Sequence, residues 1–225
     1  MILRRALVAI FAVLFEDQAL KFYIKTNFYL HRSEPLLGDW LYLNFVENPG
    51  MAFGLAFGGD TGKLILTIVR IIASVVIALY LRKLLQEKAH TGLIMCVAII
   101  FAGAIGNIID SVFYGLLFSA SSATPLKGIA QFMPPEGGYA TFFFGKVVDM
   151  FEFRVYWPHW VPSLGGRQVF PPIFNVADAA ISTGVITVIV FQKKFFAKKE
   201  GATDTTDEEP SSTKDPVIED QEAAS

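Results

Sequence analysis

Four long apolar segments constrain this chain more than any other feature of its sequence. They cover approximately residues 6–24, 64–85, 91–114 and 172–195. A helix needs about 20 predominantly apolar residues to cross a hydrocarbon core of roughly 30 Å, and each segment has about that length. With 53% hydrophobic residues and a mean hydropathy of +0.46, the chain is more apolar than a soluble domain of 225 residues requires. We therefore predict an α-helical integral membrane protein with four transmembrane helices.

Basic residues gather before the first apolar segment, around the connection of the second with the third, and around the end of the fourth. They are Arg4 and Arg5; Arg82, Lys83 and Lys88; and Lys193, Lys194, Lys198 and Lys199. Cytoplasmic loops are enriched in Lys and Arg, so both termini are predicted to be cytoplasmic. The first segment contains Asp17 and Lys21 and lacks a small-residue cleavage site, so we interpret it as a retained helix rather than a signal peptide.

The two long connections, approximately 25–63 and 115–171, then lie on the outer side of the membrane. Within them, residues 40–45 and 147–155 are rich in aromatics and alternate between apolar and polar side chains. This period of two predicts short strands. We expect a small extracytoplasmic sheet that forms a β-cradle on the outer membrane surface.

Gly, Pro and Ser mark two irregular stretches of the second outer connection. Residues 119–125 and 133–138 are predicted to be loops, and a lid over a site would have this composition. Residues 200–225 hold nine acids and one Lys, without periodicity. We predict that they form a disordered acidic cytoplasmic tail, and that residues 1–199 form the membrane domain.

Four aspartates lie in or beside the apolar segments. Because a helix rises about 1.5 Å per residue, Asp17, Asp110 and Asp178 are predicted roughly 10, 6 and 9 Å below the same outer surface. Asp149 precedes the fourth segment and can approach this level from the outer loop. Since a carboxylate at membrane depth is costly, the sequence predicts a functional site in the outer half of the membrane.

Metal and thiol chemistry have little support in the sequence. The three histidines, His31, His90 and His159, are scattered outside the apolar segments, and there is no His-Glu-x-x-His motif. The single cysteine, Cys96, has no histidine beside it, which argues against a cysteine nucleophile. We therefore expect no metal and no other cofactor.

Carboxylate chemistry remains as the prediction. Two close carboxylates in a low-dielectric site cannot both ionise easily, so one keeps its proton. The ionised partner can accept a proton from an attacking water, while the protonated partner donates a hydrogen bond to the developing oxyanion. Position alone favours Asp178 as one member of the pair, but does not distinguish Asp149 from Glu152 as the other.

Five motifs occur in order along approximately residues 5–195. They are Asp17-Gln18-Ala-Leu-Lys21; Glu47-Asn48-Pro-Gly50-Met-Ala-Phe53-Gly54; Gly103-Ala-Ile-Gly106-Asn107-Ile-Ile-Asp110; Gly145-Lys-Val-Val-Asp149; and Phe174-Asn175-Val-Ala-Asp178-Ala-Ala-Ile181. With these motifs the chain resembles the lipoprotein signal peptidases, also called signal peptidase II, which are aspartic proteases of the bacterial cytoplasmic (inner) membrane.

The resemblance implies that Asp149 and Asp178 form a catalytic dyad facing the outer leaflet. It also implies supporting or substrate-binding roles for Asp17, Lys21, Asn48, Gly54, Gly106, Asn107, Asp110 and Asn175. The implied substrate is a prolipoprotein whose cysteine carries diacylglycerol, and cleavage is implied just before that cysteine. We expect membrane lipids as further partners, no nucleic acid, and a monomer, since one chain forms the site.

This chain departs from the family pattern in two respects. The family usually has an arginine after the aspartate of its third motif, and this chain has Ser111. Lys146 and Arg154 are the candidates to replace that arginine as partners of the aspartate. Residues 112–145 and 156–171 are longer than expected between the motifs, and we interpret both as outer-surface insertions.

Other interpretations of the same residues remain open. A proton-coupled transporter or channel also needs intramembrane acids, but it needs polar residues through the whole membrane, and the inner halves of the apolar segments are almost wholly apolar. A structural membrane subunit would tolerate Asp178→Asn. Asp17 and Lys21, four residues apart, suit a structural ion pair, and Asn175 suits a helix cap as well as a ligand of the dyad.

Overall fold

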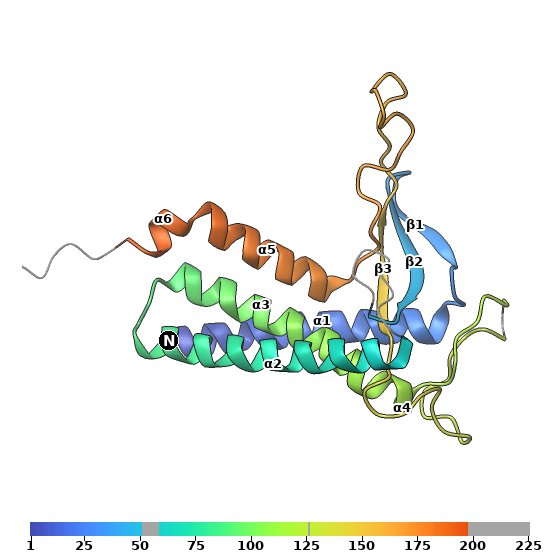
Figure 1. Cartoon of the computed structure of the whole chain (residues 1–225), viewed down its shortest axis with the longest axis horizontal. Helices are drawn as coiled ribbons and strands as arrows, with labels where there is room; N and C mark the ends of the chain where they lie inside the picture. Colours follow the sequence, from blue (N-terminus) through green and yellow to red (C-terminus); the bar gives the residue numbers. More distant parts are fainter. Residues whose placement is uncertain (51–58, 126, 198–225) are drawn as a thin grey trace, which may run out of the picture.

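The computed structural model describes residues 1–50, 59–125 and 127–197, which form a helical bundle with a small sheet across one end (Figure 1). The helices are α1 (Ile2–Asn27), α2 (Gly59–Gln86), α3 (Thr91–Ile109), the π-helical turn η1 (Asp110–Tyr114), α4 (Gly115–Leu117), α5 (Val176–Val190) and α6 (Gln192–Phe195). The strands are β1 (Ser33–Leu37), β2 (Leu41–Asn48) and β3 (Val147–Phe153).

Helix α3 is the central element of the bundle, because it packs against α1, α2 and α5. Small residues allow its close approach to α5. A Cβ atom on Gly103 would lie 2.3 Å from the backbone oxygen of Ala177, and one on Gly184 would lie 2.5 Å from Ile100. Gly103 and Gly184 therefore act as packing residues at the contact between α3 and α5.

The helices present apolar side chains outward, as a protein in lipid requires. On α2, Ile65, Ile72 and Leu79 are each more than half exposed. By length and composition, α2 and the continuous helical stretch Thr91–Leu117 can each cross a membrane. The chain thus has the features of a membrane protein. That α1 and α5 also cross it stays a prediction.

The ends of the predicted helical segments need correction. The first two helices begin and end outside the predicted ranges, and the third continues through η1 to Leu117. The fourth begins at Val176, and not at Pro172, because the Asn175 side chain caps it and two prolines precede the cap region. It ends at Val190 and is followed by the separate turn α6.

The three strands form one antiparallel sheet in the order β1-β2-β3. Both predicted strands are confirmed as β2 and β3, and Val46 lies opposite Asp149 in their register. Strand β1 is not among the predicted strands; it is an edge strand of five residues that contains Pro35. Proline is tolerated at such an edge, but it weakens the strand signal.

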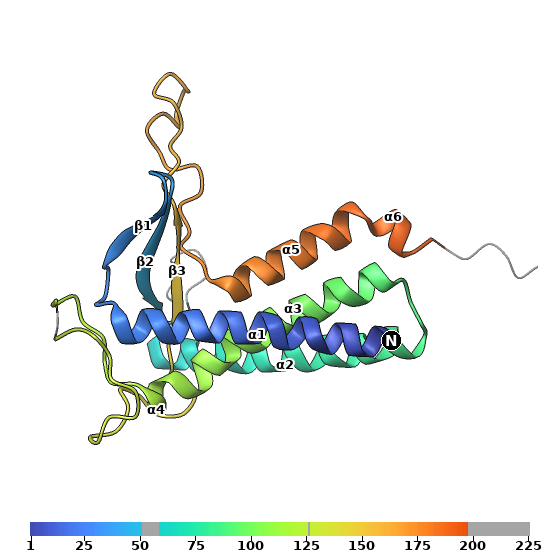
Figure 2. The ribbon, with the colours of Figure 1, turned by 180° about the vertical axis from the view of Figure 1, so that it is seen from behind.

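Seen from either side, the sheet lies at the end of the bundle away from the N-terminus, and its strands run across the helix axes (Figures 1 and 2). An apolar core lies at this end, where Phe45 of β2 packs with Phe118, Val148 and Met150. The predicted loops 119–125 and 133–138 belong to an irregular connection, apart from one isolated bridge between Phe118 and Phe132.

Two predictions fall outside the described residues. Gly54, a predicted site residue, lies within 51–58, and the acidic tail covers 200–225. A lid function for the irregular loops stays a prediction.

We expect Gly103→Val to weaken the contact between α3 and α5. The new side chain would meet the backbone of Ala177, which cannot move without shifting α5, so overpacking should lower the free energy of unfolding by about 1–3 kcal/mol or more. Thermal unfolding of the purified protein in detergent measures this. Ala104→Val, on the neighbouring and half-buried position of α3, is the matched control. An unchanged unfolding temperature for Gly103→Val would contradict the packing described.

Candidate active site

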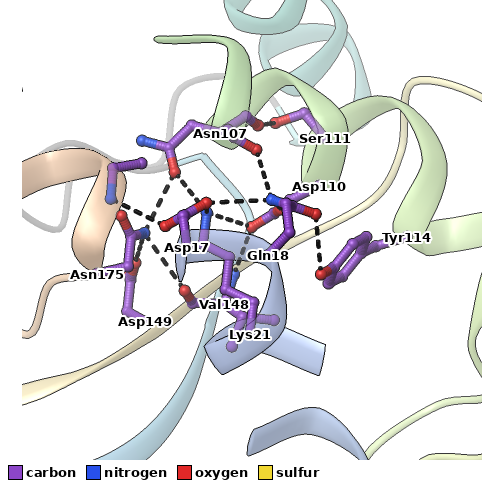
Figure 3. A network of polar contacts seen from close by, with 12 residues as sticks. Asp17, Gln18, Lys21, Asn107, Asp110, Ser111, Tyr114, Val148, Asp149 and Asn175 are labelled. Carbon is purple, nitrogen blue, oxygen red and sulfur yellow. Dashed lines mark hydrogen bonds and ion pairs between the residues drawn. The ribbon is translucent and has the colours of Figure 1, made fainter. Parts of the chain in front are cut away.

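Lys21 lies at the centre of a fully buried cluster of charges (Figure 3). Its ammonium nitrogen is 2.8 Å from the Asp17 carboxylate and 2.9 Å from the Asp110 carboxylate. Asp17 and Lys21 are one turn apart on α1, whereas Asp110 is the first residue of η1. Because none of the three side chains is exposed, each charge depends on its partners in place of water.

Asp17 also joins α1 to the beginning of α5. Its second carboxylate oxygen accepts a hydrogen bond of 2.9 Å from the backbone N–H of Ala177. The neighbouring Gln18 amide donates to Asp110 over 2.9 Å and to the backbone oxygen of Gly106 over 3.2 Å. A Cβ atom on Gly106 would lie 2.6 Å from the Asp17 carboxylate. Glycine at this position therefore makes room for the cluster.

Asn107 connects the charged cluster to Asp178. Its amide oxygen accepts a hydrogen bond of 3.0 Å from the Lys21 ammonium group, which fixes the orientation of the amide. The amide nitrogen is then directed at Asp178, to which it donates over 2.8 Å. One residue of α3 thus links the lysine of α1 to the aspartate of α5.

Asn175 brings Asp149 and Asp178 together. Its amide nitrogen donates to the Asp149 carboxylate over 2.7 Å, and its amide oxygen accepts from the backbone N–H of Asp178 over 2.9 Å. The Asp178 carboxylate in turn accepts from the backbone N–H of Asn175, which completes a capping box. Asn175 is therefore both the cap of α5 and a ligand of the candidate dyad.

Asp149 of β3 accepts hydrogen bonds from two asparagines, Asn175 and Asn48. Only 4% of its surface is exposed, and Asn48 at the end of β2 donates to it over 3.2 Å. Burial, followed by the charge of nearby Asp178, raises the pKa of Asp149 to about 7. The adjacent Val148 N–H donates to Asp110 over 3.2 Å, which ties the strand to the charged cluster.

A second buried ion cluster supports the same end of β2. Lys25 of α1 forms an ion pair with Glu47 and donates to the Ser121 hydroxyl over 3.1 Å. The Lys146 ammonium nitrogen is 3.0 Å from Glu47, and Lys25 lies 4.9 Å from the centre of the Tyr139 ring. Burial alone would raise the pKa of the Glu47 carboxyl group, but the charges of Lys25 and Lys146 have the larger effect and lower it. The sequence analysis missed this cluster, because Lys25 lies just beyond the first apolar segment and Glu47 and Lys146 lie in the two outer connections.

The comparisons with known proteins agree with these motifs. The family model of signal peptidase (SPase) II matches residues 9–194. A lipoprotein signal peptidase of Porphyromonas gingivalis is 44% identical over 180 residues, which cover 77% of this chain and 76% of that protein. One from Amoebophilus asiaticus is 34% identical over 226 residues, covering 94% and 90%. The chain belongs to the signal peptidase II family.

The fold is also similar to that of a solved bacterial membrane enzyme. The structure, determined by the in meso method at 2.3 Å resolution, aligns with a TM-score of 0.52 and 24% sequence identity. The alignment covers 88% of this chain and 93% of that one. The chain therefore shares the fold of that membrane enzyme.

Nearly all residues that the family motifs single out converge on one region of the structure. Asp17, Lys21, Asn48, Gly106, Asn107, Asp110, Asp149, Asn175 and Asp178 belong to one connected set of contacts. They come from α1, β2, α3, η1, β3 and α5, as Figure 3 shows for most of them. The roles of these residues in the family's reaction remain predictions at this point.

The expected replacement for the missing family arginine is wrong. Neither Lys146 nor Arg154 pairs with Asp110 in the structure. Arg154 follows β3 and forms an ion pair of 2.8 Å with Glu152 on the outer part of the strand. Lys146, just before β3, pairs with Glu47. Asp110 forms its ion pair with Lys21 of α1 instead.

We expect Lys21→Met to destabilise the protein by about 3–5 kcal/mol, because it leaves two carboxylates buried without their cation. Thermal unfolding in detergent at neutral pH measures the loss. Lys83→Met is the matched control on α2, since Lys83 and its partner Glu87 are mostly exposed. That change should alter the stability by less than about 1 kcal/mol. Equal effects of the two substitutions would contradict the importance of the buried cluster.

Proposed function

We propose that this chain is a membrane aspartic endopeptidase that removes the signal peptide from diacylglyceryl-modified prolipoproteins. Membership of the signal peptidase II family makes it a protease, and several relatives are named lipoprotein signal peptidases. The aspartic mechanism, with Asp149 and Asp178 as the dyad and cleavage just before the lipidated cysteine, is the part that we add.

One observation carries the proposed mechanism. Asn175 contacts both aspartates, so two acids from β3 and α5 are held in one buried site. Since the pKa of Asp149 is raised to about 7, this carboxyl group keeps a proton under conditions in which an ordinary aspartate has lost it. Asp178 accepts hydrogen bonds from Asn107 and from the backbone of Asn175, which suit its ionised form.

In the proposed reaction, the Asp178 carboxylate removes a proton from a water molecule as the water attacks the peptide carbonyl carbon. The protonated Asp149 donates a hydrogen bond to the carbonyl oxygen, which develops negative charge. The tetrahedral intermediate then collapses when the leaving amine nitrogen accepts a proton from the dyad. The products are a signal peptide with a free carboxylate and a lipoprotein with a free amine on its cysteine.

The proposed membrane placement matches this substrate. In this placement α1, α2, α3 and the stretch of α5 with α6 cross the inner membrane, both termini are cytoplasmic, and the sheet lies at the outer surface. Figure 1 supports this arrangement, because the N-terminus and the end of α6 lie away from the sheet. A dyad at the junction of β3 and α5 can then meet an extended peptide at the membrane surface, while the acyl chains remain among the helices. We propose that the protein acts as a monomer.

The transporter alternative has less support. The core at the end of the bundle away from the sheet is built from apolar side chains, among them Ala6, Ile10, Leu84, Leu93 and Val97. A proton pathway would need polar groups there as well. The polar network is thus confined to one end of the described helices, which suits a site that opens to one side.

Asp149→Asn and Asp178→Asn should each abolish cleavage while leaving the fold intact, because asparagine preserves size but cannot exchange a proton. The assay follows conversion of a purified diacylglyceryl-modified prolipoprotein by mass spectrometry, in parallel with thermal unfolding. We expect each rate to fall by at least about 10³-fold, in line with the loss of general acid–base catalysis together with activation of water.

Glu152→Gln is the matched control. Glu152 lies on the same strand, but its carboxylate pairs with Arg154 and faces away from the dyad network. This variant should keep cleavage within a few-fold of the unsubstituted protein. Cleavage by either aspartate variant at a near-normal rate, with the correctly folded protein, would overturn the proposed dyad.

A further inference from the structure

Arg70 is a charged residue within the apolar helix α2. It lies 11 residues after Gly59, or about 16 Å along the helix from its first residue. Its neighbours Ile68, Val69 and Ile72 are exposed apolar side chains of the lipid-facing type. An arginine at such a depth is costly and is by default a functional residue, but no motif in the sequence analysis includes it.

The guanidinium group is directed toward the candidate active site. Arg70 donates a hydrogen bond of 3.2 Å to the Ser111 hydroxyl, and this hydroxyl donates to the backbone oxygen of Asn107 over 2.8 Å. The carboxylates of Asp178 and Asp149 both lie within electrostatic range of the guanidinium. Figure 3 shows Ser111 on the same face of the helix as Asn107, beside the polar network.

Arg70 has donor capacity that these contacts do not use. A guanidinium carries five N–H donors, and among the residues that the structure describes Arg70 makes one hydrogen bond and no ion pair. Asp110 also lies within electrostatic range of Arg70, but its ion pair, at 2.9 Å, is with Lys21. The remaining donors therefore suit acceptors on a bound molecule better than a structural partner within the chain.

We propose that Arg70 is a substrate-binding residue whose guanidinium binds a carbonyl oxygen of the substrate next to the bond that is cleaved. This proposal rests on the proposed function above. Arg70 of α2 thus supplies, beside Ser111, the guanidinium that other family members carry at the position of Ser111 itself.

The depth of Arg70 favours a carbonyl oxygen over a lipid phosphate. Phosphates lie in the headgroup region, whereas this residue is about three helical turns inside α2. Arg70 also lies within electrostatic range of Asp178 and Asp149, so the peptide carbonyl oxygens beside the cleaved bond are the acceptors that this position favours. A charged donor to a carbonyl oxygen contributes about 1.5–3 kcal/mol, equivalent to about 10- to 100-fold in affinity.

Three variants of the full-length protein test the proposal: Arg70→Leu, the double variant Arg70→Leu/Ser111→Arg, and the control Arg82→Leu. Arg82 lies on the same helix but is exposed near its other end. The first measurement is the Kd of a fluorescent diacylglyceryl peptide whose bond before the cysteine is non-hydrolysable. The second is kcat and KM for the cleavable peptide, and the third is thermal unfolding.

We expect Arg70→Leu to weaken binding of the non-hydrolysable peptide by about 10- to 100-fold without lowering the unfolding temperature. Ser111→Arg in that background should restore at least half of the lost binding free energy, and Arg82→Leu should bind normally. Normal binding by Arg70→Leu, a matching loss in Arg82→Leu, a loss explained by unfolding, or a double variant no better than the single one would each overturn the proposal. Because binding is measured without cleavage, an incorrect dyad would appear only in kcat.

Discussion

The ion pairs of Lys21 with two buried aspartates are the interaction on which the rest of the site depends. Asp17 and Asp110 approach the same ammonium group from α1 and from the end of α3, so the two helices can pack in only one register there. Removing one partner of such a pair leaves a buried charge without a counterion or water. This lowers the free energy of unfolding far more than the loss of a surface ion pair does. The cluster therefore holds α1 and the end of α3 in the relative position that the site requires.

Two asparagines extend this frame to the candidate dyad. Asn107 accepts a hydrogen bond from the Lys21 ammonium group and donates one to the Asp178 carboxylate. Asn175 then connects Asp178 to Asp149. Each amide has one acceptor and two donors, so its orientation is determined by the charged groups around it. The positions of the two acids thus follow from contacts that begin at a lysine on another helix.

Much of this arrangement could be predicted from the sequence, and the failures have physical causes. An acid inside an apolar helix has few structural explanations, so Asp178 could be identified from its position alone. Asp149 could be identified only through the family motif, because acids on surface strands are usually solvated. The cation that pairs with Asp110 is Lys21, which lies far from it in the sequence. This pairing depends on how the helices pack, so sequence position alone does not predict it. Arg70 could have been found, since it is an arginine within a predicted membrane helix, but its direction toward Ser111 appears only in the structure.

The pH dependence of kcat/KM for a lipidated peptide without titratable groups tests the central claim most directly, namely that one acid stays protonated while the other activates water. Burial and Asp178 raise the pKa of Asp149 to about 7, so its proton, and with it the donor to the carbonyl oxygen, is lost above that pH. Because the dyad titrates as a coupled pair, the profile should be bell-shaped, with a fall of about tenfold per pH unit on the alkaline side. A value of kcat/KM that stays constant from about pH 6 to about pH 9 would contradict the account.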